Sequence, residues 1–204
     1  NGGKIFYLSA DDSDNSPLFR DMKIWVFLKC IQNADLDPEN LVIEYINANY
    51  GAAAPLVLTF YHELEKAERG ATRVIGWDSS HLQDTEITGK MMMRWNQMFD
   101  RMETCVRHDT EAADAVSALR WILDYNIVSR WNDFVTDNPE EKGKLEFYHK
   151  RCARAIQRNY GANFVHSTNK NYGSKMWGLI RALDEYAAIH YPSKKNLPKE
   201  LAEV

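Results

Sequence analysis

The chain has 204 residues, of which 45% are apolar and 26% are charged, and this composition is typical of a folded protein rather than a disordered one. Its net charge of −4, from 25 basic and 29 acidic residues without a dense Lys/Arg block, predicts neither a nucleic-acid partner nor binding to an anionic membrane surface. The longest apolar run, near residues 52–58, is too short to cross a bilayer and contains Pro55.

The N-terminal residues differ in pattern from the rest of the chain. Residues 4–9 form the one strand-like run, and the polar segment 11–15 follows it. Because a lone strand has nothing to pair with, we expect residues 1–15 to be an extended lead-in, either left from a preceding barrel or sheet or lying on the helices. The chain begins Asn-Gly-Gly rather than with Met, and we interpret it as a fragment of a longer protein.

Helix signals follow one another along residues 16–190. Serine, aspartate or asparagine followed by proline, at Ser16, Asp37 and Asn138, is typical of a helix start, and glycines after Tyr50 and at Gly70 are typical of helix ends. Apolar residues recur every three or four positions between these signals. The pattern predicts helices over residues 16–33, 38–50, 53–67, 84–105, 111–134, 139–160 and 174–190.

These elements predict an all-α protein, an antiparallel bundle or array of about seven helices in one domain over residues 16–190. We expect residues 71–82 to be the longest irregular connection and residues 191–204 to be a weakly held tail. No fixed-period repeat is visible, so a solenoid is a minor alternative.

The sequence contains no local motif of a catalytic, cofactor or metal site. The six histidines lack the three- or four-residue spacing of metal ligands on a helix, and no phosphate loop, dinucleotide fingerprint or nucleophile elbow is present. We therefore predict no metal and no cofactor. The cysteines, an odd number at wide spacing, are interpreted as buried free thiols on apolar helix faces: Cys30, Cys105 and Cys152.

Polar and aromatic residues outside the predicted core are the remaining candidates. Glu63, Glu65 and Glu68 are interpreted as a solvated helix face, and His62 beside Glu63 as a surface pair rather than a general base. His108 and Asp109 lie where a helix is being capped. Tryptophans on apolar stripes are assigned to the core, namely Trp25, Trp95, Trp121 and Trp131. The residues left as candidates for a ligand or domain contact lie in predicted loops or beside them: Trp77, Asp78, His81, Tyr172 and Trp177.

Residues 28–53 resemble a known pattern. They read Leu-Lys-Cys-Ile-Gln-Asn-Ala-Asp-Leu-Asp-Pro-Glu-Asn-Leu, run on through Glu44-Tyr45 and end in Asn-Tyr-Gly-Ala-Ala. This is similar to the helical region that follows the catalytic barrel in α-glucuronidase-like bacterial glycoside hydrolases and in a related family of unknown function. The chain departs from the family at Gln32, where the family has Trp, at Ala34, where it has Pro, and at Asn49, where it has Tyr. The motif residues that match are Lys29, Asn33, Asp37, Glu44, Tyr50 and Gly51.

The resemblance implies a diverged branch of that family, a periplasmic or secreted location, and catalytic carboxylates upstream of residue 1. It assigns no catalytic residue to this chain. Independently of any family, Asn33 and Asp37 are expected to terminate and cap helices, and Tyr50-Gly51 to form a tight corner where small alanines let helices approach closely.

Three hypotheses follow for the function. The first is a non-catalytic C-terminal helical domain of a larger glycoside-hydrolase-like protein, which supports the upstream barrel or an oligomer contact. Carbohydrate is a candidate ligand of this domain. The second is a stand-alone helical interaction or scaffold module. The third, an independent small enzyme that uses His81 or His62, has the least support.

Overall fold

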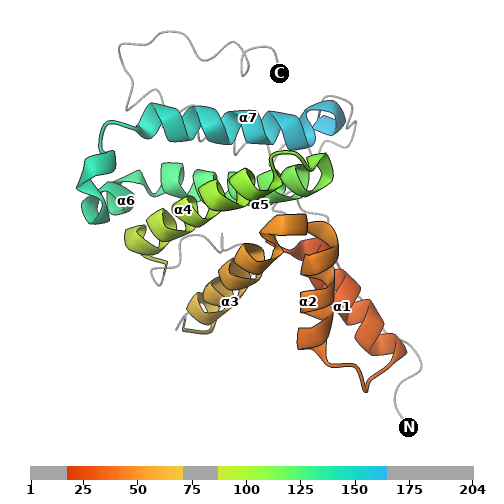
Figure 1. The fold of residues 1–204 in the computed structure, drawn as a ribbon. Coiled ribbons are helices and arrows are strands. Elements are labelled where there is room, and N and C mark those ends of the chain that lie inside the picture. The colour runs from red at the N-terminus through yellow and green to blue at the C-terminus, as the bar shows by residue number, and fades with distance from the viewer. Residues whose placement is uncertain (1–17, 71–86, 165–204) are drawn as a thin grey trace.

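The structure, a computed structural model, describes residues 18–70 and 87–164, and within these residues it is all-α (Figure 1). The helices are α1 (Arg20–Gln32), α2 (Pro38–Asn49), α3 (Ala54–Gly70), α4 (Gly89–Val106), α5 (Thr110–Ser129), α6 (Trp131–Asp137) and α7 (Leu145–Phe164), with short 3-10 turns η1 (Gly51–Ala53) and η3 (Pro139–Glu141). The predicted fold class is confirmed. The predicted strand-like run 4–9 and the predicted helix 174–190 lie outside the described residues.

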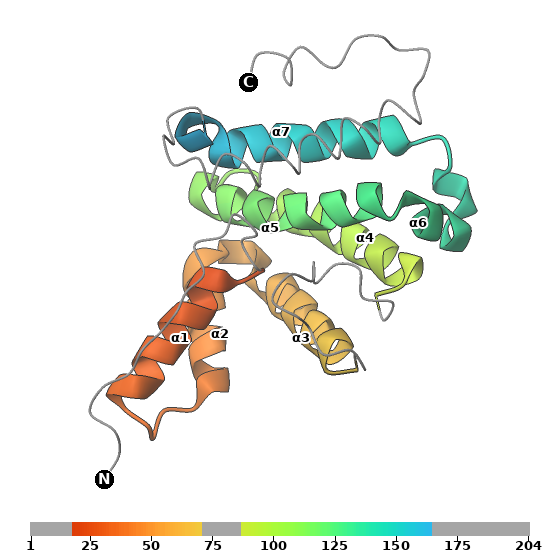
Figure 2. The same cartoon turned by 180° about the vertical axis from the view of Figure 1, so that it is seen from behind.

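The helices lie in three levels (Figures 1 and 2). The pair α4 and α5 forms the middle level together with α6, α7 packs on α5 from one side, and α1, α2 and α3 lie on the other side. The turn η1 contacts α3, α4 and α5, so it joins the lower helices to the middle level. Helix α1 makes its main contacts with α2, and the α1–α2 hairpin projects away from the other helices.

Aromatic and methionine side chains fill the interior between these levels. Phe60 of α3 meets Trp95 and Phe99 of α4 edge-on, at ring-centroid distances of 5.2 and 5.0 Å. Methionines Met92 and Met102 are fully buried beside them, in agreement with their predicted role as core fillers. This shared core is what holds α3 to α4 and keeps the lower level attached.

The predicted starts of the first and fourth helices are wrong. The first helix begins at Arg20 rather than near Ser16, because Phe19 has a left-handed backbone, φ 61°, and packs its ring on Phe60 and Tyr61. The fourth begins at Gly89 rather than at residue 84 or 85, with the Thr88 hydroxyl accepting a hydrogen bond from the Met91 N–H at 3.2 Å.

The predicted helix 111–134 is two helices. At Arg130 the backbone leaves the helical region, and the guanidinium donates a hydrogen bond of 2.8 Å to the Ile87 carbonyl oxygen. The chain turns there, so that Trp131 and Phe134 of α6 point into the core. A contact across 43 residues thus ends α5 where the local periodicity alone predicts that it continues.

The predicted helix 139–160 begins later and ends later. The Asn138 side chain does not cap it. Instead its amide donates hydrogen bonds to the carbonyl oxygens of Gly89, at 3.0 Å, and Phe134, at 2.8 Å. One 3-10 turn follows, α7 begins at Leu145, and it continues through Gly161 to Phe164.

Candidate functional site

The five candidates for a ligand or domain contact, Trp77, Asp78, His81, Tyr172 and Trp177, lie outside the described residues. The motif residues of the resemblance lie on the α1–α2 hairpin. Asn33 is the C-cap of α1, and its Oδ1 accepts a hydrogen bond of 3.0 Å from the Asp35 N–H. Asp37 is the N-cap of α2 and accepts at 3.0 Å from the Glu39 N–H, as predicted.

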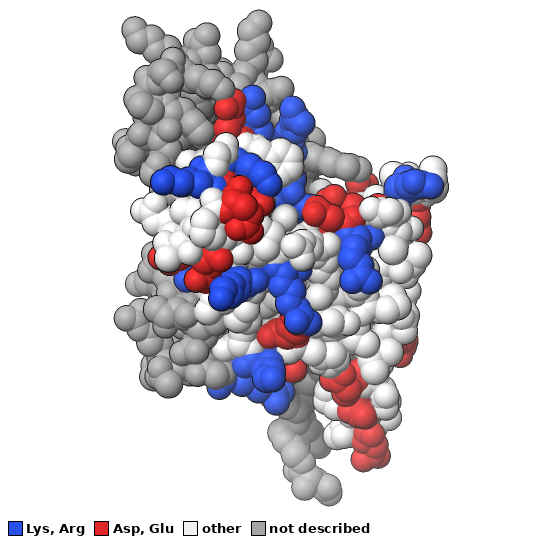
Figure 3. Space-filling view, turned by 60° about the vertical axis from the view of Figure 1, so that its left-hand side comes forward, with Lys and Arg blue, Asp and Glu red and all other residues white. Residues whose placement is uncertain are grey.

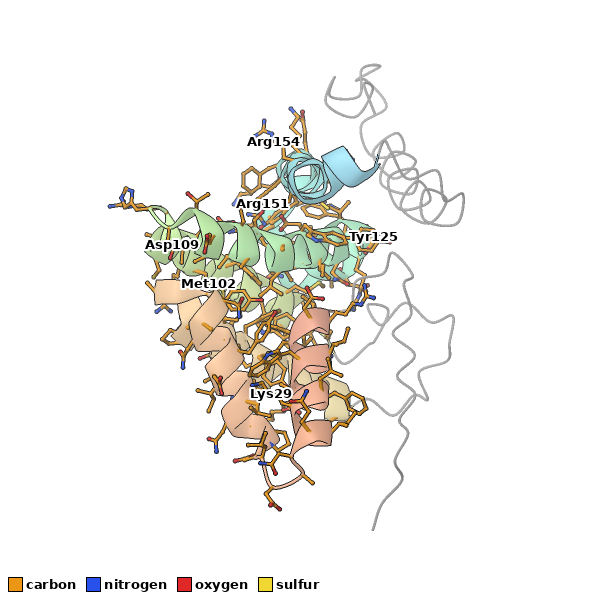
Figure 4. All side chains as sticks on the ribbon, turned by 90° about the vertical axis from the view of Figure 1, so that its right-hand side faces the viewer. Lys29, Met102, Asp109, Tyr125, Arg151 and Arg154 are labelled. Atoms are coloured by element: carbon orange, nitrogen blue, oxygen red, sulfur yellow. The ribbon has the colours of Figure 1, made fainter. Side chains whose placement is uncertain are left out.

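The other motif residues do not form one site. Lys29 extends over the Trp25 ring, 5.2 Å from its centroid, and Trp25 itself is half-buried against Tyr45 (Figure 4). Glu44 is exposed on α2. Tyr50 is buried at the corner, where burial and then the neighbouring Tyr45 raise the pKa of its hydroxyl.

The predicted corner at Tyr50-Gly51 is a close approach of three helices. Gly51 has a left-handed backbone, φ 48°, and a Cβ there would lie 2.9 Å from Oδ2 of Asp109 and 3.3 Å from Cβ of Ala112. Asp109 is the N-cap of α5 and accepts at 3.1 Å from the Ala112 N–H. The corner thus needs glycine both for its backbone and for the space.

Charged residues inside the α4–α5–α7 contact form a group that the sequence did not suggest, here called the polar cluster: Asn96, Asp100, Glu103, Arg120, Asp124 and Arg151. Arg120, 2% exposed, donates from Nη2 to Asn96 Oδ1 at 3.1 Å and to Asp100 Oδ1 at 2.5 Å, and from Nη1 to Glu103 Oε2 at 2.6 Å. This guanidinium of α5 therefore binds three side chains on one face of α4.

Arg151 joins α7 to the same cluster and lies between α7 and α5 (Figure 4). Its Nε donates to Asp124 Oδ2 at 2.8 Å and its Nη2 donates to Asp124 Oδ1 and to Asn96 Oδ1, at 2.5 and 2.6 Å. The guanidinium carbon also lies about 5 Å from the ring centroids of Phe147 and Tyr148. Arg151 is therefore fixed from several directions at once.

Burial dominates the electrostatics of the cluster. Asp124 is 0% exposed, and burial raises the pKa of its carboxyl, against the hydrogen bonds and charge of Arg151 and the charge of Arg120, which lower it. Burial also raises the pKa of Glu103, again against the two arginines. With three carboxylates and two guanidiniums in contact, the charges are nearly balanced, and the ion pairs join α5 to α4 and to α7.

The described helices α3, α4 and α5 enclose a small cavity. A cavity of about 20 Å³ between α3, α4 and α5 is lined mainly by apolar side chains, and small-molecule pockets are about 300–1,000 Å³. Within the described ranges no group of three or more His, Cys, Asp or Glu side chains could hold a metal ion. None of the described helices is long and apolar enough to span a membrane.

Several single residues also differ from their predicted settings. Cys105 is exposed rather than buried and Cys30 is half-buried, whereas Cys152 is fully buried and burial raises the pKa of its thiol. Glu63 is not on a solvated face, because its carboxylate accepts hydrogen bonds from Arg94 and, at 3.0 Å, from Trp95 Nε1. His62 pairs with Glu39 of α2 across 3.2 Å at the surface rather than with Glu63.

Helix α1 exposes several apolar side chains. Eight of its 13 residues are apolar, yet only Met22 is buried. Ile24, Phe27, Leu28 and Ile31 follow one stripe at helical spacing, here called the outer face of α1, and Phe27 and Leu28 are 38% and 47% exposed. On the face shown in Figure 3, acidic and basic side chains are interspersed over most of the surface, and acidic side chains alone line its lower right.

No protein-family model, curated protein or solved structure matches this chain. The resemblance of residues 28–53 to the α-glucuronidase-like family therefore stays a prediction from the sequence.

Proposed function

We propose that this chain is a non-catalytic helical domain whose role is to make a protein contact through the outer face of α1, within a larger glycoside-hydrolase-like protein. One observation carries the contact. A helix that is apolar on all sides is normally buried, and α1 is covered mainly by α2 on one side.

The outer face has the composition of an interaction surface rather than of a solvated helix. Phe27 and Leu28 are neighbours at its centre, with Ile24 and Ile31 one turn away on either side. Burying a large apolar side chain stabilises by about 1.5–3 kcal/mol, so two half-exposed ones leave roughly 2 kcal/mol to be gained from a partner. Apolar stripes of this kind mark protein contacts more often than isolated exposed residues do.

The resemblance supplies the proposed setting. Residues 28–53 span the end of α1, all of α2 and the η1 corner, so the residues that match the family build the hairpin that carries the outer face. In that setting the chain would support a catalytic barrel or hold copies together, and the chemistry would belong to the barrel. The stand-alone interaction module differs only in lacking the barrel.

Cysteine labelling of the outer face tests the contact. We expect Leu28→Cys, in a background with Cys30→Ser and Cys105→Ser, to react rapidly with a maleimide in the dilute isolated chain and to be protected in the longest natural protein that contains this sequence. Phe147→Cys is the matched control, because Phe147 is 56% exposed on α7, and this helix lies across the middle level from the hairpin in Figure 1. Equal reactivity of Leu28→Cys in both proteins, at all concentrations, would refute the proposal.

A further inference from the structure

We draw no further inference here: the strongest candidate, the outer face of α1 around Phe27 and Leu28, carries nothing beyond the protein contact already proposed, because nothing in the structure shows what covers this apolar surface.

Discussion

Replacing Arg151 by methionine should destabilise the protein more than any other removal of one charge from α7. Methionine keeps much of the length of the side chain but removes both hydrogen bonds to Asp124, which is 0% exposed and would keep its carboxylate buried without its hydrogen-bonded cation. Breaking a buried ion pair on one side costs about 3–5 kcal/mol. At roughly 2–4 °C per kcal/mol for a chain of this size, the melting temperature should fall by about 6–20 °C.

Two further variants separate the buried ion pair from a general effect of substitution. Lys150→Met removes the neighbouring charge, whose ion pair with Glu146 is at the surface at 3.0 Å, and should cost only about 0.5 kcal/mol. The double variant Asp124→Leu with Arg151→Met removes both charges, so urea unfolding should show stability within about 1–2 kcal/mol of the wild type.

The pH dependence gives an independent check of the same reasoning. Burial already raises the pKa of Asp124, and loss of Arg151 removes the main influence that lowers it, so the variant's folded state should bind this proton at a higher pH than its unfolded state does. The proton then stabilises the fold below the unfolded pKa, and this contribution is lost as the pH rises through the folded pKa. The stability deficit of Arg151→Met relative to wild type should therefore shrink between pH 7 and pH 4. A stability deficit that is the same at both pH values, or no larger than that of Lys150→Met, would refute the conclusion that Arg151 compensates the buried charge of Asp124.

Three other predictions concern the described helices. Gly89→Ala should lower the free energy of unfolding in urea by about 2–4 kcal/mol, because the new Cβ would lie 2.8 Å from the Asp137 Cβ. Gly143→Ala is the control: no atom lies within 4 Å of its new Cβ, so it should be neutral or stabilise by about 0.5 kcal/mol. Equal effects of the two substitutions would contradict the close approach of α4 and α6. Gly51→Ala should lower the free energy of unfolding by at least about 2 kcal/mol, because alanine is strained at φ 48° and its Cβ would be crowded there. The shift of the urea unfolding midpoint measures this loss. A thiol reagent should label Cys105 within seconds in the native state and Cys152 only on unfolding, because Cys152 is buried and burial raises its thiol pKa; rapid native labelling of Cys152 would contradict the packing of α7.

Local signals were sufficient where a helix end depends on its own neighbours. Asp37 before Pro38, Gly51 after Tyr50 and Asp109 before α5 all act within a few residues of chain, and each has the capping or turning role that its type favours. They were insufficient where a distant group competes for the same atoms. Asn138 has the sequence pattern of an N-cap, but its side-chain amide instead donates a hydrogen bond to the carbonyl oxygen of Gly89, 49 residues away.

The polar cluster shows the same limit for the candidate site. Arg120 and Asp124 are four residues apart on α5, within an otherwise apolar stretch, and that was the one signal the sequence held. Their partners, Asn96 and Arg151, come from two other helices, and nothing in the separate periodicities of α4 and α7 relates these positions to each other. A charge on a buried helix face therefore predicts that a partner exists, without saying which one.

Helix α1 illustrates how a structure adds information even where the sequence predicts the element correctly. The spacing of Trp25, Phe27, Leu28 and Ile31 predicts a helix. Because apolar residues occur on every side of this helix, however, their periodicity does not indicate which side faces the core. The structure buries Met22 and leaves Phe27 and Leu28 partly exposed, so it shows which side of this apolar helix faces the core and which side faces outward.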